Sequence, residues 1–318
     1  MAGLLNKFVV GASVVVGMSA VVAPAQAAII GMNGSDYATY THDNSGQNLE
    51  NLWVVGDEAT AINALTDGDL TTNVELGYSG EGDKASVGFT AVAGGYTVNV
   101  SSVTDAEFAT FQEQWVADLL DAYAPLKAVL SGLSSDVQTI AKSVFTGAVG
   151  SGDVNVAEFS LDETGAISMQ TMGFYDLKPR VNMMINEAKS LATQELAKEF
   201  MSLNALLPEW LAMTTASNII NTQVNPFLAA LNEIDALQIS EIAKVTINGK
   251  SEYVYSFNAT NSDFAALDDI AGGSYTGVYS WSKAGQPPVA AVPEPSTMLG
   301  LMAVGGLFAA AKRKANKA

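Results

Sequence analysis

Strand-like and helix-like segments follow one another in blocks along this chain, and that order limits the folds it can adopt. Short alternating patterns occupy residues 52–56, 73–79, 85–92 and 96–103, with glycine-rich turns between them. A helical block then extends to about residue 149. The regular strand–helix alternation of a doubly wound parallel sheet is missing. The blocks therefore predict an α+β fold: an antiparallel β-rich body, with a sandwich as one arrangement, that carries amphipathic helical insertions.

The helical block begins with a recognisable signal. Thr104 can cap the first turn while Glu107 reaches back to it, which is the capping-box pattern. Apolar residues then recur at helical spacing and predict one buried face. That face contains Phe108, Phe111, Trp115, Val116, Leu119, Leu120 and Tyr123. Pro125 interrupts the pattern, and a second amphipathic stretch covers residues 126–145.

Later segments repeat this block order. Residues 154–162 and 166–176 predict a hairpin, and helices are expected from 180 to 207 and from 208 to 237. A last hairpin surrounds Asn248-Gly249, a pair that suits a type I′ turn. We expect this hairpin to pair with the N-terminal sheet. A further strand is expected within residues 274–281.

These patterns divide the body of the chain, residues 28–282, into five parts. They are β-rich 28–104, mainly helical 105–149, hairpin 150–176, helical 180–237 and β-rich 238–282. Whether they form one domain or two stays open. Residues 283–292 read as a linker to a separate C-terminal segment, 293–318.

Residues 1–27 have the three parts of a secretory signal peptide. Lys7 supplies the positive charge, residues 8–22 form the apolar segment, and Ala25-Gln26-Ala27 gives the small-x-small pattern. We expect signal peptidase to cut between Ala27 and Ala28. Pro24 and the cleavage pattern argue against the alternative, a permanent N-terminal membrane helix.

The other end combines three features. Pro293-Glu294-Pro295 precedes an uncharged run of 15 residues, Thr297 to Ala311, and Lys312, Arg313 and Lys314 follow. As a helix the run would reach only about 22 Å, short of the roughly 30 Å hydrocarbon core. The basic cluster favours a cytoplasmic tail with the body outside. This pattern predicts a transient association with the membrane through the C-terminal helix.

The C-terminal pattern resembles the PEP-CTERM sorting signal of exported bacterial proteins. The resemblance implies that a membrane-embedded exosortase cuts near Pro293-Glu294-Pro295, and that the body goes to the cell surface, outer envelope or extracellular space. A simple membrane anchor, the alternative, does not explain the triplet. Residues 64–76, 85–89 and 237–260 also resemble a group of cyanobacterial-type PEP-CTERM proteins with no established activity.

Charge and cysteine content exclude several classes of function. The first 27 residues and the stretch after Glu294 hold five of the 15 cations and none of the 33 acids, so the body between them has a net charge of −23. Nucleic-acid phosphates would repel such a body, so we expect no nucleic-acid partner. The chain has no cysteine, which excludes thiol catalysis and cysteine-ligated metals.

The catalytic inventory is also small. His42 is the only histidine, so a two-histidine metal site is excluded, and no Gly-x-Ser-x-Gly elbow offers it a serine partner. The glycines of residues 77–84 lack the Gly-Lys-Ser/Thr ending of a P-loop. Among 33 acids a pair suited to glycoside hydrolysis could occur, but nothing in the sequence identifies one. We therefore expect no enzyme activity and no cofactor, with a secreted hydrolase as the alternative.

Two ligand sites can be considered. Asp67 and Asp69 flank Gly68, with Glu75 after them, and such oxygen-rich turns can hold calcium. The stretch weakly resembles a calcium-holding loop of discoidin-like sugar-binding jelly rolls. A plain Asx-rich turn explains it as well, and is preferred. Aromatic residues of the strands could bind sugars, although core packing is favoured for them. They are Tyr78, Tyr96, Tyr253, Tyr255, Tyr275, Tyr279 and Trp281.

The sequence thus predicts an exported surface or extracellular-matrix protein. Its expected role is non-enzymatic, binding or structural, in a polysaccharide-rich envelope, with extracellular polysaccharide as a partner.

Overall fold

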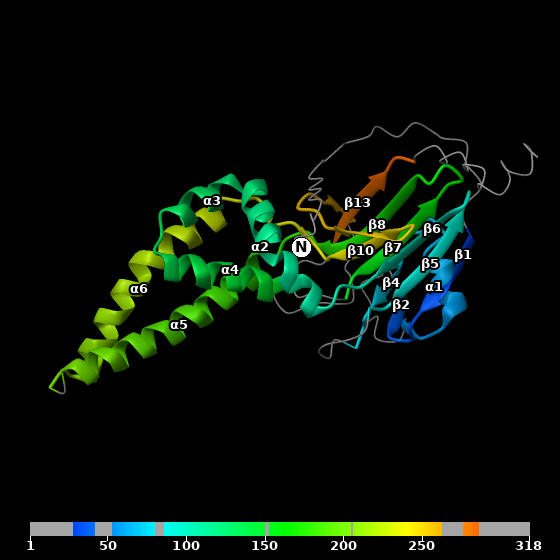
Figure 1. The fold of residues 1–318 in the computed structure, drawn as a ribbon. Helices are drawn as coiled ribbons and strands as arrows, with labels where there is room; N and C mark the ends of the chain where they lie inside the picture. Colours follow the sequence, from blue (N-terminus) through cyan, green and yellow to red (C-terminus); the bar gives the residue numbers. More distant parts are fainter. Residues whose placement is uncertain are drawn as a thin grey trace, which may run out of the picture.

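The computed structural model describes residues 28–41, 53–79, 86–149, 153–204, 206–262 and 276–285. Two antiparallel sheets form a sandwich at one end of the molecule, and the helices other than the short α1 (Glu58–Ala64) occupy the other end (Figure 1). This arrangement confirms the predicted α+β class.

The first sheet has five strands, in the order β1-β5-β6-β10-β11. Their bounds are Ala28–Asn33, Gly88–Ala93, Tyr96–Ser101, Ala243–Ile247 and Lys250–Val254. The last hairpin joins this sheet because β10 pairs with β6, with Val245 opposite Val100. Asn248 and Gly249 have φ of 48° and 80°, as a type I′ turn requires. The predicted pairing of this hairpin with the N-terminal sheet is confirmed.

The second sheet has the strand order β12-β13-β8-β7-β4-β2-β3, and β9 pairs with β8. In that order the bounds are Thr260–Asn261, Gly277–Lys283, Ile167–Phe174, Asn155–Leu161, Thr72–Leu76, Tyr37–Thr41 and Trp53–Val55, with β9 at Ile239–Ser240. The predicted hairpin is β7–β8. Because β13 continues through Lys283, the predicted linker cannot begin at that residue.

The helices are α1 (Glu58–Ala64), α2 (Asp105–Ala122), α3 (Ala124–Ser131), α4 (Ser135–Val149), α5 (Lys178–Leu203) and α6 (Glu209–Asn232). The capping box that opens α2 is present, with Thr104 and Glu107 bonded reciprocally. Three sequence-based boundaries were wrong. The short helix α1 lies inside the predicted β-rich part, and a break at Gly132 splits the expected helix 126–145 into α3 and α4. Helix α6 ends at Asn232, short of the expected residue 237.

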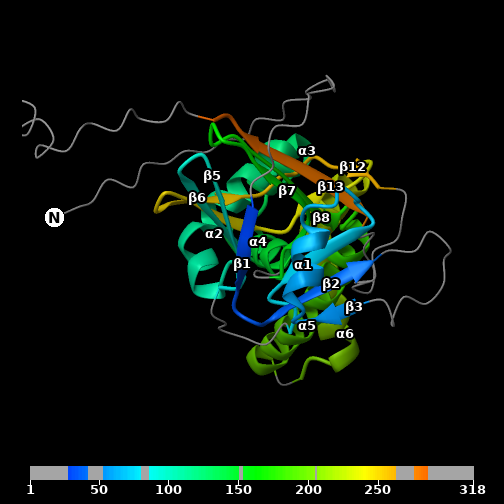
Figure 2. The ribbon, with the colours of Figure 1, turned by 90° about the vertical axis from the view of Figure 1, so that its right-hand side faces the viewer.

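Both helical blocks connect one sheet to the other. Helices α2, α3 and α4 lie between β6 of the first sheet and β7 of the second, while α5 and α6 lie between β8 and the return to the first sheet. Viewed along the long direction of the molecule, the sandwich stands in front of the helices (Figure 2).

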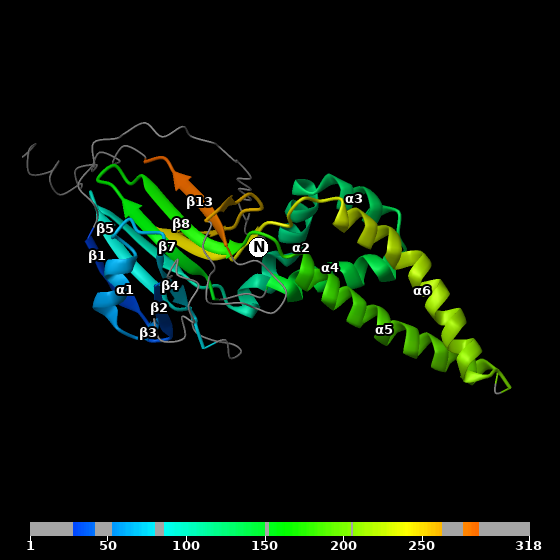
Figure 3. The same cartoon turned by 180° about the vertical axis from the view of Figure 1, so that it is seen from behind.

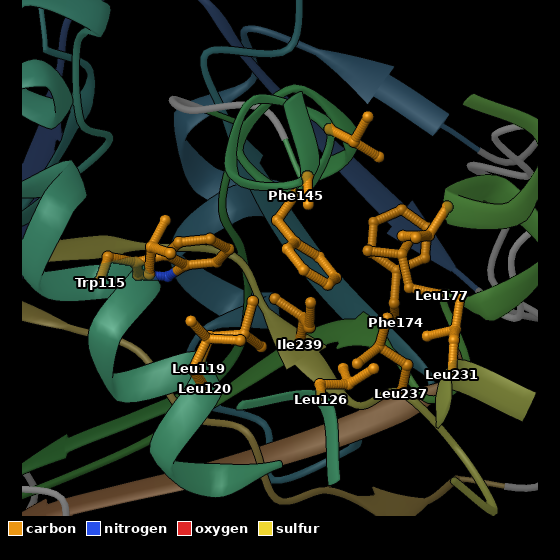
Figure 4. Packing of buried hydrophobic residues seen from close by; sticks show 14 of the residues in the cluster. Trp115, Leu119, Leu120, Leu126, Phe145, Phe174, Leu177, Leu231, Leu237 and Ile239 are labelled. Atoms are coloured by element: carbon orange, nitrogen blue, oxygen red, sulfur yellow. The ribbon is translucent and has the colours of Figure 1, made fainter. Parts of the chain in front are cut away.

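Two separate cores hold these layers. The sandwich core joins both sheets, and Phe89 of β5 meets Phe159 of β7 edge to face at 5.0 Å. The second core lies between the helices and the end of the second sheet, where Trp115, Phe145 and Phe174 are fully buried (Figure 4). Five of the seven residues predicted for the buried face of α2 are buried there, and Phe111 and Tyr123 are half-buried against them.

Helices α5 and α6 pack against each other as a long hairpin, which we call the arm, and it extends beyond the other helices (Figures 1 and 3). With 26 residues, α5 is roughly 39 Å long. The base of the arm belongs to the helical core through residues such as Val181 and Leu231, whereas its distal part has a small cluster of its own.

Candidate functional site

Several predicted site residues lie outside the described residues, and their roles stay predictions. They are Ala25, Ala27, His42, Pro293, Glu294, Pro295, Lys312, Arg313 and Lys314. Ala28, the residue expected to follow the signal-peptidase cut, begins β1 at one edge of the five-stranded sheet.

The predicted calcium turn follows helix α1, and its two aspartates are exposed. Asp67 Oδ1 accepts a hydrogen bond from the Asp69 amide at 2.8 Å, and its Oδ2 accepts one from the Thr72 hydroxyl at 2.9 Å. Asp69 Oδ1 accepts from both the amide and the hydroxyl of Thr71. The hydroxyl and amide of Thr71 lower the pKa of Asp69, so the carboxylate is ionised at neutral pH. The geometry is that of an Asx-rich turn.

Glu75 does not share this environment. It lies in β4, is 3% exposed, and accepts a hydrogen bond from the Tyr40 hydroxyl at 2.5 Å. Within the described ranges, no three acidic or histidine side chains are grouped so that they could hold a metal ion. The structure therefore brings Asp67 and Asp69 together in one turn but gives Glu75 different partners. Calcium binding stays the alternative to the preferred Asx-rich turn.

Glu75 belongs to a buried polar group that the sequence did not reveal. Its cross-strand partner is Asn155 of β7, which is 3% exposed. The Asn155 amide donates a hydrogen bond of 2.9 Å to Oε2 of Glu241, a glutamate that is itself 6% exposed. Two buried carboxylates thus flank one strand residue. The sequence signal was a single acid, Glu241, between the apolar residues Ile239 and Ile242.

Most of the predicted aromatic residues serve packing. The Tyr253 ring stacks on Phe111 of α2 at 4.1 Å and 20°, and the Tyr255 ring lies parallel to Phe111 at 6.4 Å. The Tyr255 hydroxyl donates to Asp118 at 2.7 Å. These contacts join the last hairpin to α2. Both rings are half-buried in these contacts, in agreement with the favoured core packing.

The remaining aromatic residues follow the same trend. Tyr279 is 2% exposed, and its hydroxyl donates to the Phe174 carbonyl. Burial raises the pKa of Tyr279 well above its ordinary value, so it stays neutral. Trp281 is half-buried against the sandwich core, and Tyr78 and Tyr96 are half-buried. Tyr275 lies outside the described residues.

The arm carries a group of large apolar side chains that are mostly exposed to solvent. Leu203, Leu206 and Trp210 surround the turn between α5 and α6 and are 78%, 91% and 68% exposed. A shallow hollow of about 280 Å³ lies between the two helices. Its lining residues are Asn186, Lys189, Ser190, Thr193, Gln194, Met213 and Ser217. Among the described residues, the arm therefore presents the most exposed of the large apolar side chains, while Val54, Val55 and Ile140 are exposed elsewhere.

Among the described helices, none combines the length and the apolar character needed to cross a membrane. In the comparison with known proteins, a family model of the PEP-CTERM protein-sorting motif matches residues 291–314. No match was found among curated proteins or solved structures. The match covers the triplet, the apolar run and the basic cluster in the order described above.

Proposed function

We propose that the exported body of this PEP-CTERM domain-containing protein is a non-enzymatic binding or structural component of a polysaccharide-rich envelope. The sorting motif at residues 291–314 makes the chain an exported protein that an exosortase processes and that is sorted to the cell envelope. The location within the envelope, the signal-peptidase cut and contact with polysaccharide belong to the proposal.

One observation carries this proposal: the arm extends away from the part of the body that leads to the sorting signal. Strand β13 runs away from the helices, so its C-terminal end lies on the side of the sandwich opposite to the arm (Figures 1 and 3). A body attached through that end would present the arm outward. The candidate ligand groups already have partners inside the protein. Asp67 and Asp69 accept hydrogen bonds within their own turn. Tyr253 stacks on Phe111, and the Tyr255 hydroxyl donates to Asp118.

The intact mass of the protein recovered from culture medium and from membranes tests the processing. We expect a mass that begins near Ala28 and ends near residues 293–295. The matched variant, with Pro293 and Pro295 replaced by alanine, should keep its tail and remain with the membrane. A wild-type mass that retains residues 312–318 would mean that the tail is a permanent anchor.

Calcium is tested separately, by thermal unfolding with and without millimolar calcium. Because Asp67 and Asp69 already accept hydrogen bonds within their turn, we expect the Tm to stay unchanged. A ligand present at 100 times its Kd would add about 2.7 kcal/mol. A rise of that order, absent in Asp67→Asn, would establish a calcium site instead.

One observation favours the alternative, a secreted hydrolase. Glu75 and Glu241 are buried carboxylates on either side of Asn155, and glycoside hydrolysis uses a pair of carboxyl groups. The test is release of reducing ends from envelope polysaccharide. Under the main proposal the wild type releases none above the level of a Glu75→Gln and Glu241→Gln double variant. A wild-type rate that this variant abolishes while it stays folded would establish the hydrolase.

A further inference from the structure

The two helices of the arm differ in charge. Helix α5 carries Glu187 and Lys189 near its middle, and Glu195, Lys198 and Glu199 in its distal half. Helix α6 has a single charged residue, Glu209 at its start, and none from residue 210 to 232. In a chain with 48 acidic and basic residues among 318, a solvent-facing helix of this length without charge is unusual. Charge depletion together with exposed aromatic side chains is typical of the core of an interface.

The exposed side of distal α6 is uncharged and combines large apolar side chains with threonine and asparagine. Trp210, Leu211 and Ile219 are 68%, 37% and 39% exposed. The exposed hydroxyls of Thr214 and Thr222 donate to the carbonyls of Trp210 and Asn218 at 2.7 and 2.8 Å. Since these hydroxyl hydrogens are used inside the helix, the threonines need no other acceptor. We call the exposed side chains of Trp210, Leu211, Thr214, Thr215, Asn218 and Ile219 the α6 face.

The distal arm has little core of its own. Only three alanines, Ala197, Ala212 and Ala216, make up its buried cluster, with partly buried side chains such as Phe200 and Met213 around them. Alanine burial contributes little, because the hydrophobic free energy follows the apolar area removed from water. In a four-helix bundle, each helix packs its apolar side chains against more than one neighbouring helix. Two helical hairpins together supply the four helices of such a bundle.

We propose that the α6 face docks on the same face of a second copy of this chain, so that two arms form an antiparallel four-helix bundle around a two-fold axis. This inference goes beyond the proposed envelope role and does not depend on it.

Charge identifies the second copy as the partner. The body between the two ends has a net charge of −23, so most of its surface repels another copy. The α6 face is where two copies can meet without opposing like charges. An antiparallel contact also puts the two bodies at opposite ends of the bundle. The 24-residue helix is roughly 36 Å long, several times the screening length of about 8 Å at physiological salt.

The first experiment measures the molar mass of the protein, recovered after expression of the full chain, over a range of concentrations by sedimentation equilibrium. We expect a monomer–dimer equilibrium that tightens as salt screens the acidic bodies. Ile219→Glu and Trp210→Glu should each weaken the dimer by about tenfold or more, because each buries a charge at the contact. The matched control is Ile140→Glu on α4, where the isoleucine is 43% exposed, and it should leave the mass unchanged.

A second measurement uses the absence of cysteine in the chain. Under oxidation, Asn218→Cys on the α6 face should form a disulfide-linked dimer, whereas Leu191→Cys on α5, where the leucine is 64% exposed, should stay monomeric. A monomer up to about 100 μM in the first experiment overturns the proposal, as does equal crosslinking at both positions. Binding of the monomer to zwitterionic lipid vesicles, lost in Trp210→Glu, would assign the face to a membrane surface and also overturn it.

Discussion

At the scale of single residues, Glu107 joins a local motif to a distant strand. Its carboxylate caps α2 by accepting from the Thr104 amide at 3.2 Å, and it forms an ion pair of 2.5 Å with Lys244 of β10. The first bond was predictable because its partners lie three residues apart. The second joins residues 137 positions apart, and no local pattern encodes it.

Glu107→Gln should therefore lower stability in a pH-dependent way. Burial raises the pKa of Glu107, but the bonds from Lys244 and Thr104 outweigh it and leave the pKa lowered. When the pKa of a carboxyl group is lower in the folded than in the unfolded state, its ionised form stabilises the fold. That stabilisation is complete above the unfolded-state pKa and is lost as the pH falls through the folded-state pKa. We expect a loss of about 1 kcal/mol at pH 7, shrinking below about pH 4.5. Urea unfolding at pH 7, 5 and 3.5 measures it; a constant difference would contradict the ion pair.

A pair of glycines offers a matched comparison at the same scale. Gly94 and Gly95 form the turn between β5 and β6, with φ of 55° and 85°. A Cβ on Gly94 would lie 1.8 Å from the Glu163 carbonyl oxygen, in the turn of the β7–β8 hairpin, while one on Gly95 meets open space among the described residues.

Alanine at either glycine carries the cost of a left-handed backbone, about 1–2 kcal/mol. Gly94→Ala must also displace the Glu163 backbone, so we expect it to cost about 2 kcal/mol more than Gly95→Ala. Chemical denaturation of both variants measures the difference. Equal losses would show that the two hairpin turns do not touch in solution.

At the scale of elements, a tyrosine fixes the end of α2 to the strand side of the helical core. The Tyr123 hydroxyl donates to the Gln238 carbonyl at 3.0 Å and accepts from the Gln238 amide at 2.7 Å. The periodicity of α2 predicted that Tyr123 faces inward, and it does. Its role as a double hydrogen-bonding partner depends on a segment 115 residues away.

Tyr123→Phe leaves the amide and carbonyl of Gln238 without this partner. We expect it to lower the free energy of unfolding by about 1–3 kcal/mol. Burial raises the pKa of Tyr123 to about 12, so the hydroxyl stays protonated and the loss should be the same at pH 6 and pH 9. Thermal unfolding at both pH values checks this. A loss confined to pH 9 would mean that the phenol ionises there.

At the scale of the whole molecule, the two large cores and the distal arm are separate packing units. The helical core includes the base of the arm and the sandwich core joins the two sheets, whereas the distal cluster consists of three alanines and the side chains around them. The distal arm thus contributes exposed surface to the molecule and little to the stability of the folded body.

Replacing residues 190–221 by a short glycine–serine linker should therefore leave the body folded. We expect the near-ultraviolet circular dichroism to keep its aromatic signal and the Tm to change by a few degrees only, because Trp115, Phe145 and Phe174 keep their contacts. Self-association should disappear in the same variant. A body that unfolds would show that the arm stabilises the whole chain.

The sequence by itself determined what depends on neighbouring residues. The capping box, the buried face of α2, the type I′ turn at Asn248-Gly249 and the α+β class follow from spacing and local conformation, and the sorting motif is a contiguous pattern at the chain end. The tertiary structure decided what depends on distant residues. It placed Glu75 and Glu241 around Asn155, turned Tyr253 and Tyr255 toward Phe111, and left the uncharged α6 face exposed. Which side chains are buried and which residues pair depends on which elements pack together. The periodicity of apolar residues along the sequence does not show which helix face is left exposed.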